Sequence, residues 1–194
     1  MAEPGSMADA FPKGSKKMKV SVFYLPSIGS RAEIEEGMAG LRNDLYQKML
    51  GELTEQAKAA DQLGYDSISF TEHHFHIEGE EVSTNPIMLD LYFGMQTKNM
   101  KLGQLGNVLP SKNPINVAED IAMASQMLQG RVFAGFARGY QPRWVNVLGQ
   151  QIGLASPASG EDYEELKRSL FEEHFDIILE AWKNDTFAFK GKHW

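Results

Sequence analysis

Residues 65–76 read YDSISFTEHHFH, in which alternating apolar and hydroxyl side chains lead into a cluster of acidic and imidazole groups. Successive side chains of a β-strand point to opposite faces, so the apolar Ile68 and Phe70 share one face and the two serines take the other. Ligands of parallel α/β folds gather beyond the carboxyl ends of the strands. This stretch therefore predicts a strand that delivers the polar cluster to a candidate site.

The strand pattern recurs at three other places and alternates with helical periodicity. Apolar residues at steps of three and four predict helices. Strands are predicted over 18–25, 65–71, 101–109 and 131–137, and helices over 45–63, 86–95, 114–129 and from 162 onward. Residues 27–42 are polar, bear glycine and serine, and are interpreted as a loop. Four strand–helix alternations imply right-handed βαβ units and a parallel sheet.

The predicted fold class is α/β, of the parallel (β/α) TIM-barrel type, with residues 18–194 supplying the first four β/α units. A complete barrel takes about 250 residues, and four strands alone leave an unpaired edge on each side of the sheet. Three arrangements are open: the first half of a barrel, an open α/β sheet, or a chain completed by a second copy. Residues 1–17 are expected to be a disordered lead-in or tag.

Composition excludes several classes of protein. The 194 residues carry a formal net charge of −7, opposite to the basic surface that a nucleic-acid partner favours. The chain has no cysteine, which excludes a disulfide scaffold, a thiolate nucleophile and Cys-ligated zinc. No apolar run approaches the roughly 20 residues of a membrane helix, and the N-terminal segment lacks the apolar core of a secretory signal. We expect a cytoplasmic protein that binds neither nucleic acid nor membrane.

Glu72, His73 and His74 form the sharpest local feature of the chain. Imidazole titrates near neutrality, so His73 is a candidate general base or hydrogen-bond donor that points toward the mouth of the barrel. A metal site built from all three is a second interpretation, although adjacent strand residues face opposite ways and do not easily share one ion. The third interpretation is structural, with strand-end imidazoles binding backbone carbonyls.

Glycines accompany the third and fourth predicted strands. Gly103 and Gly106 lie in the third, where glycine marks a bulge, a close backbone approach or simply tight packing. Gly106 would also ease an unusual peptide geometry. Arg138, in the run GFARG at 135–139, offers a fixed cation for a phosphate or an anionic ring. This last motif is weak on its own because Gly-Arg-Gly loops are common.

Taken in order, these motifs resemble the bacterial luciferase-like flavin-dependent monooxygenase family, and especially its alkanal-oxidising subunits. The resemblance covers residues 19–194. It rests on EHHF at 72–75, NP at 85–86, LG at 102–103, VLP at 108–110, NP at 113–114, AED at 118–120, QML at 126–128, GRV at 130–132 and RG at 138–139. Each run is common alone, whereas the combination is specific.

The resemblance implies a barrel that binds reduced FMN, supplied by a separate flavin reductase. With O₂ it would oxidise a small organic substrate, aldehyde-like or similar, through a flavin C4a-peroxide. The implied site residues are His73 as the catalytic group, Glu72 and His74 in the substrate pocket, Leu105 and Gly106 as a non-proline cis peptide against the flavin ring, and Ala137 and Arg138 beside the ring and the phosphate. At Ala137, luciferase catalytic subunits can carry a reactive cysteine. The resemblance implies a homo- or hetero-oligomer and no metal.

Other functions stay open at this point. The barrel of the family continues through four further strands, so the chain is also interpreted as a non-catalytic flavin-binding or subunit-type protein, or as an inactive truncated barrel. The same barrel family includes deazaflavin-dependent oxidoreductases, which makes hydride transfer a further possibility.

Overall fold

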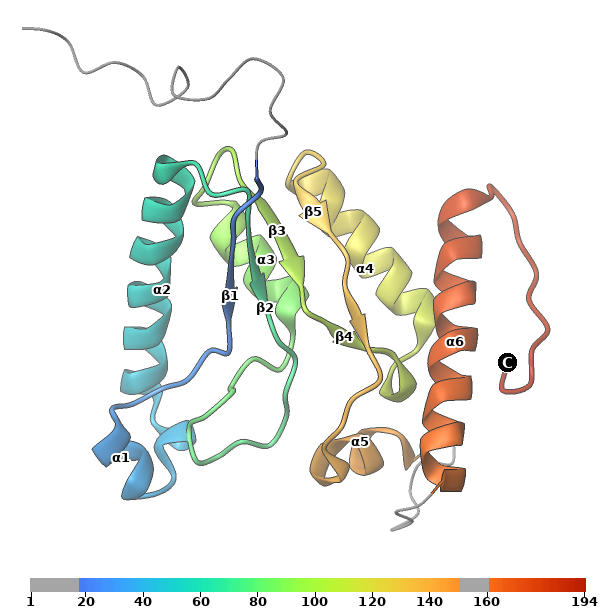
Figure 1. Cartoon of the computed structure of the whole chain (residues 1–194), viewed down its shortest axis with the longest axis horizontal. Helices are drawn as coiled ribbons and strands as arrows, with labels where there is room; N and C mark the ends of the chain where they lie inside the picture. Colours follow the sequence, from blue (N-terminus) through green and yellow to red (C-terminus); the bar gives the residue numbers. More distant parts are fainter. Residues whose placement is uncertain (1–17, 151–160) are drawn as a thin grey trace, which may run out of the picture.

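The computed structural model describes residues 18–150 and 161–194, so the predicted lead-in over 1–17 lies outside the described residues. Four parallel strands form the main sheet in the order β1-β2-β3-β5, and β4 pairs with β6 in a second parallel sheet (Figure 1). The strands are β1 (Ser21–Tyr24), β2 (Ser67–Phe70), β3 (Lys101–Gln104), β4 (Asn107–Val108), β5 (Val132–Phe133) and β6 (Phe136–Ala137). The helices are α1 (Arg31–Glu35), η2 (Ala39–Leu41), α2 (Asn43–Leu63), α3 (Pro86–Gly94), η3 (Leu109–Ser111), α4 (Pro114–Met127), α5 (Pro142–Leu148) and α6 (Glu161–Lys183). The predicted parallel α/β sheet is confirmed.

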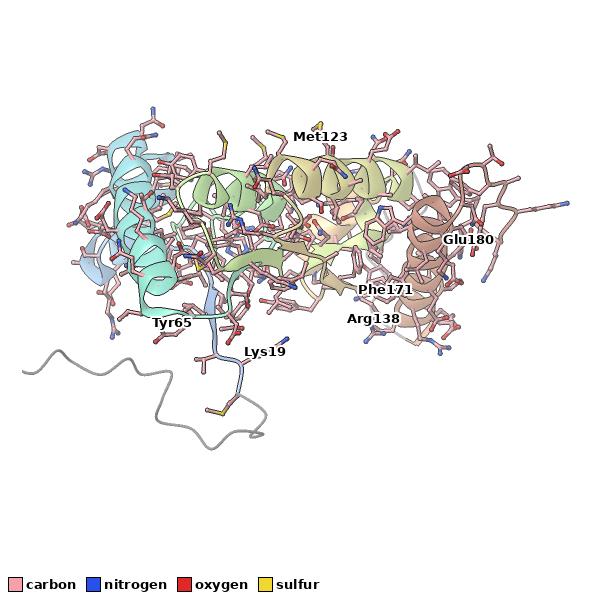
Figure 2. All side chains as sticks on the ribbon, turned by 90° about the horizontal axis from the view of Figure 1, so that it is seen from above. Lys19, Tyr65, Met123, Arg138, Phe171 and Glu180 are labelled. Carbon is pink, nitrogen blue, oxygen red and sulfur yellow. The ribbon has the colours of Figure 1, made fainter. Side chains whose placement is uncertain are left out.

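One register row across the main sheet explains which of its faces is buried. Val22, Ile68, Leu102 and Val132 lie opposite one another on the four strands. Ile68 and Leu102 belong to the apolar core that α2 and α3 complete, and the two outer residues pack against that core. Figure 2 shows α3 and α4 along one side of the sheet. The predicted apolar face of β2 is therefore the face that the helices cover.

The ends of the helices are set by local capping chemistry. The side chains of Asn85 and Asn113 accept hydrogen bonds from the first turns of α3 and α4, and each stands just before a proline at the first helical position. Both prolines fit there because the first turn of a helix leaves its N–H groups without helical partners. Gly64 ends α2 with a left-handed φ of 80°.

Two predicted strands are interrupted at the same level of the sheet. The third strand breaks into β3 and β4, with a cis peptide bond between Leu105 and Gly106 at the break. The fourth breaks into β5 and β6. After the break β4 turns to pair with β6, because the backbone of Asn107 donates to the Gly135 carbonyl at 2.8 Å. A continuous strand over 101–109 was therefore the wrong expectation.

Helices also occur where a loop was predicted. The segment 27–42 contains α1 and η2, and α1 begins with a reciprocal cap in which Ser30 and Glu33 satisfy each other's backbone N–H. That capping box was readable from the sequence. The short α5, after β6, was not predicted, and α4 ends at Met127 rather than just before Gly130. Within residues 18–150 and 161–194, no helix is both long and apolar enough to cross a membrane.

Two glycine-to-alanine substitutions should change stability in opposite directions. A β-carbon on Gly103 would lie 2.5 Å from the carbonyl oxygen of Phe133 and equally near its ring, so Gly103→Ala overpacks the sheet. We expect a loss of about 1–3 kcal/mol in the free energy of unfolding. A β-carbon on Gly51, inside α2, meets nothing within 4 Å, so Gly51→Ala should add about 0.5–1 kcal/mol. Urea denaturation of both variants tests this, and equal signs would contradict it.

Candidate functional site

A cavity of about 440 Å³ opens beyond the carboxyl ends of β2, β4 and β6, at the end of the molecule that holds α5 (Figure 1). Six of the seven predicted site residues line it: Glu72, His73, Leu105, Gly106, Ala137 and Arg138. The sequence places these residues in three separate stretches, and the parallel sheet brings the stretches to one edge. His74 does not line this cavity. The cavity is the candidate functional site.

His73 follows β2 and its side chain is only 8% exposed. Its Nε2 lies 3.6 Å from Oε2 of Glu81, and its ring meets the rings of Tyr140 and Trp144 edge-on. Its Nδ1 is buried and has no hydrogen-bond partner among the described residues. Burial lowers the pKa of His73 below its ordinary value, a neighbouring imidazole acts in the same direction, and the Glu81 carboxylate opposes both. His73 is therefore mainly neutral at pH 7 and available to take up a proton.

Glu72 is a fully buried carboxylate in the wall of the cavity. It accepts hydrogen bonds from Nζ of Lys112 at 2.7 Å and from the backbone N–H of Val108 at 3.0 Å, and it lies 2.9 Å from Nε2 of His74. Burial raises the pKa of Glu72, but the donors around it outweigh burial and hold that pKa below its ordinary value. Glu72 is thus charged, and it binds the end of β2 to β4 and to the segment after η3.

His74 supports the cavity wall from behind. Its Nε2 is held by Glu72, and its ring lies 5.2 Å from the ring of Trp144. His73 and His74 therefore face different partners, since His74 is held by Glu72 and His73 faces Glu81. No group of three acidic, histidine or cysteine side chains among the residues described here is arranged to hold a metal ion.

The backbone around Gly106 forms another part of the wall. A β-carbon on Gly106 would lie 2.9 Å from backbone atoms of Gly135 and Phe136, so only glycine allows the two breaks in the sheet to approach this closely. The Leu105–Gly106 peptide bond is cis, as the resemblance implied. Leu105 is 51% exposed and lines the cavity.

Ala137 and Arg138 are the other two predicted residues of the cavity wall. Ala137 ends β6, and Arg138 is exposed just beyond it. Within the described part of the chain, the guanidinium of Arg138 has no hydrogen bond or ion pair. Figure 2 shows Arg138 on the side of the sheet opposite Met123 of α4, away from the helix layer formed by α3 and α4. This cation is thus free to bind an anion that enters the cavity.

Three buried polar side chains are hydrogen-bonded in series next to the break between β3 and β4. Asp90 of α3 is fully buried and accepts a hydrogen bond from Gln104, whose Oε1 accepts one from Asn107 at 3.0 Å. Burial raises the pKa of Asp90 well above its ordinary value. These side chains lie on both sides of the Leu105–Gly106 bond and hold it against α3. The signal that sequence reasoning missed is the acidic residue inside the apolar run PIMLDLYF.

Sequence reasoning also missed three residues of the site, which lie in α5, just before it, and in the loop after β2. Tyr140 and Trp144 line the cavity and contact the His73 ring, and Glu81 faces that ring from the loop after β2. The apolar spacing of Trp144 and Val145 after Pro142 was the available signal for a short helix.

Comparison with known proteins identifies the family of this chain. Residues 18–194 match the family described as luciferase-like monooxygenase. The 3,6-diketocamphane 1,6-monooxygenase of Pseudomonas putida is 32% identical over 139 residues, which are 71% of this chain and 36% of that protein. The alkanal monooxygenase beta chain of Photorhabdus luminescens is 26% identical over 164 residues, 84% of this chain and 43% of that one.

Solved structures agree on the fold. The oxygenating constituent of the Pseudomonas putida 3,6-diketocamphane monooxygenase, a type II Baeyer–Villiger monooxygenase solved with FMN, superposes with a TM-score of 0.68 at 24% identity. The match covers 91% of this chain and 42% of that structure. A monooxygenase from Streptomyces bottropensis gives a TM-score of 0.70 at 21% identity, covering 90% of this chain and 46% of that one.

The chain is a member of the luciferase-like monooxygenase family, a class of flavin-dependent TIM-barrel enzymes. It spans less than half the length of the relatives named above. The resemblance drawn from its motifs is therefore confirmed at the level of the family and the fold.

The variant Glu72→Gln tests the carboxylate that joins the segments of the site. It removes the charge that Lys112 and His74 face, and we expect it to lower the free energy of unfolding by about 1.5–3 kcal/mol at pH 7. The folded pKa of Glu72 is depressed, so its stabilisation is complete above the unfolded pKa of about 4.3 and is lost as the pH falls through the folded value. The gap between wild type and variant should therefore shrink below about pH 4.

Glu78→Gln is the matched control in the same urea-denaturation series. Glu78 pairs with Arg143 at 3.0 Å, but the two side chains are 50% and 44% exposed. Exposed pairs of this kind contribute about 0–1 kcal/mol. Equal losses in the two variants would show that burial of Glu72 has no special effect.

Proposed function

We propose that this chain carries the flavin-facing part of an FMN-dependent monooxygenase that oxidises a small organic substrate with O₂. The observation that carries the proposal is the 440 Å³ cavity at the strand ends, in which an imidazole, a cis peptide and an unpaired guanidinium share one wall. The FMN in the related diketocamphane structure supports the choice of cofactor.

The residues present fit such a group on three counts. The hydroxyl of Thr71 and Nδ1 of His73, two buried polar atoms of cavity-lining residues, have no partner within the described residues. The Gly106 backbone and the apolar Leu105 side chain offer a flat, low-polarity edge to a ring system. The Arg138 guanidinium offers two parallel donors to a phosphate.

Reduced FMN, when bound, supplies the two electrons with which one atom of O₂ becomes water while the other enters the substrate. The chain's own contribution is positional and acid–base. His73, neutral at pH 7, accepts or donates a proton at the reacting end of the cavity. Tyr140 and Trp144 exclude water from its ring, and Glu72 holds the segment that carries it.

Reduced FMN should bind this chain, and Arg138→Ala should weaken that binding about tenfold to hundredfold. The expected loss is that of one charge-assisted contact, about 1.5–3 kcal/mol. Anaerobic titration with reduced FMN measures it. Arg143→Ala, which removes an exposed arginine paired with Glu78, is the control and should bind like wild type. Equal affinities for Arg138→Ala and wild type would remove Arg138 from the site.

His73→Ala should weaken flavin binding no more than about tenfold, the loss of one neutral hydrogen bond, and reduce oxygen-dependent product formation about 10²–10⁴-fold, the usual contribution of a positioned acid or base. The measurement is a single turnover after air is admitted to the flavin-loaded chain. Product formation at the wild-type rate would show that His73 is not the acid or base of the reaction.

A non-catalytic flavin-binding or subunit-type role is the second candidate, because the chain spans less than half of its relatives. It predicts saturable binding of reduced FMN with no oxygenated product from the chain alone. A deazaflavin-dependent role predicts binding of the deazaflavin in preference to FMN. The separate reductase, the oligomeric state, the cytoplasmic location and the identity of the substrate remain predictions.

A further inference from the structure

His73 lines a second cavity as well as the first. This second cavity has a volume of about 250 Å³, and His76 and Tyr46 also line it. The His73 and His76 rings lie 5.7 Å apart. His73 therefore lies between the proposed flavin cavity and a separate space that contains another imidazole.

Glu81 lies between the two imidazoles. Its Oε2 is 3.6 Å from Nε2 of His73 and 3.8 Å from Nδ1 of His76. The three side chains are 8% (His73), 11% (His76) and 20% (Glu81) exposed, so little water competes for them. Each distance exceeds a hydrogen bond by less than about 1 Å, which a small movement of the Glu81 side chain can close. Glu81 adopts a left-handed φ of 51°, uncommon for a residue with a β-carbon.

The hydrogen bonds of Gln141 determine the tautomer of His76, that is, which of its two ring nitrogens is unprotonated. Oε1 of Gln141 accepts from the indole N–H of Trp144 at 3.1 Å, and Nε2 of Gln141 donates to the Tyr140 hydroxyl at 2.8 Å. These two contacts fix the orientation of the amide. Nε2 of His76 lies 2.8 Å from the same Oε1, so Nε2 must be the donor. In neutral His76 the unprotonated nitrogen is thus Nδ1, the atom turned toward Glu81.

We propose that Glu81 and His76 form a proton store for His73, a role that rests on the proposed function of His73. As the Nε2–H bond of a charged His73 breaks, an O–H bond forms on Glu81. That proton then leaves Glu81 and forms an N–H bond at Nδ1 of His76. One positive charge moves from His73 to His76, no atom changes its oxidation state, and the reverse steps return the proton.

Other charged groups also lie near this cluster. Glu72 and His74 flank His73 in the chain, and His74 is already bound to Glu72. Arg138 lines the same cavity as His73. Glu78 lies near His76 but is paired with Arg143. From the α5 side, Tyr140, Trp144 and Gln141 contribute rings and an amide, with no charge.

Histidine side-chain ¹⁵N NMR on the 194-residue chain, without flavin, tests the proton store. The chain has five histidines, few enough to assign by substitution. We expect His73 to titrate in two steps separated by about 1 pH unit or more, because it shares its proton with His76. We also expect neutral His76 to carry its proton on Nε2. A single-step titration of His73, or an Nδ1-protonated His76, overturns the proposal.

Two variants separate the contributions of His76 and Glu81 to the titration of His73. His76→Gln should leave one titration step for His73 and move its midpoint up, because a nearby positive charge is lost. Glu81→Gln should move the midpoint down, because a nearby negative charge is lost. Glu80→Gln, which changes the exposed neighbouring carboxylate, is the matched control and should leave both steps unchanged. Two steps that persist in His76→Gln overturn the proposal, and should a variant unfold, the wild-type titration decides.

The same samples distinguish this proposal from the proposed function. Two-step titration in a chain that does not bind reduced FMN would support the shared proton and reject the flavin role. Binding of reduced FMN by a chain whose His73 titrates in one step would overturn the proton store and leave the flavin role standing.

Discussion

The candidate site depends on the burial of one carboxylate. Glu72 has no access to water, so donors from the protein must replace its hydration. They come from Lys112, from the backbone of Val108 and from His74, which belong to different segments of the chain. Each segment that satisfies Glu72 is thereby brought to the cavity wall. The carboxylate thus sets where β4 and η3 lie relative to the end of β2.

The imidazole next to it is a consequence of this arrangement. His73 does not take part in the hydrogen bonds of Glu72 and lines both cavities instead. The His73 ring is buried against Tyr140 and Trp144, and this burial lowers its pKa, while the nearby Glu81 carboxylate opposes the shift. A carboxylate that serves structure and an imidazole free for chemistry therefore occupy adjacent positions in the sequence.

The sequence predicted the parts of the fold in which local rules act alone. The two-residue alternation of β2, the starts of α3 and α4 at residues 86 and 114, and the end of α2 at residue 63 follow from backbone sterics and capping, and all are confirmed. The break in β3 could not be predicted from periodicity, because it depends on Asn107 pairing with Gly135 of another strand. The parallel topology explains why the predicted site residues meet, since it places the ends of β2, β4 and β6 at one edge.

The sequence alone could not identify the side chains that contact each site residue. Glu81, Gln141 and Trp144 carry no motif, and their importance appears only once α5 packs beside the loop after β2. The Gln141 amide is the clearest case, because its two fixed hydrogen bonds determine a tautomer on a histidine elsewhere in the chain. Such information belongs to tertiary contacts and is absent from any local pattern.

The hydrogen bonds that define the cavity join residues far apart along the chain. Glu72 and Val108 are separated by 36 positions, and His76 and Gln141 by 65. Closing loops of that length costs chain entropy before any contact compensates for it. The helices form from neighbours in the sequence and do not carry this cost. The cavity therefore depends on the packing of distant segments together, and no single segment of the chain can form it alone.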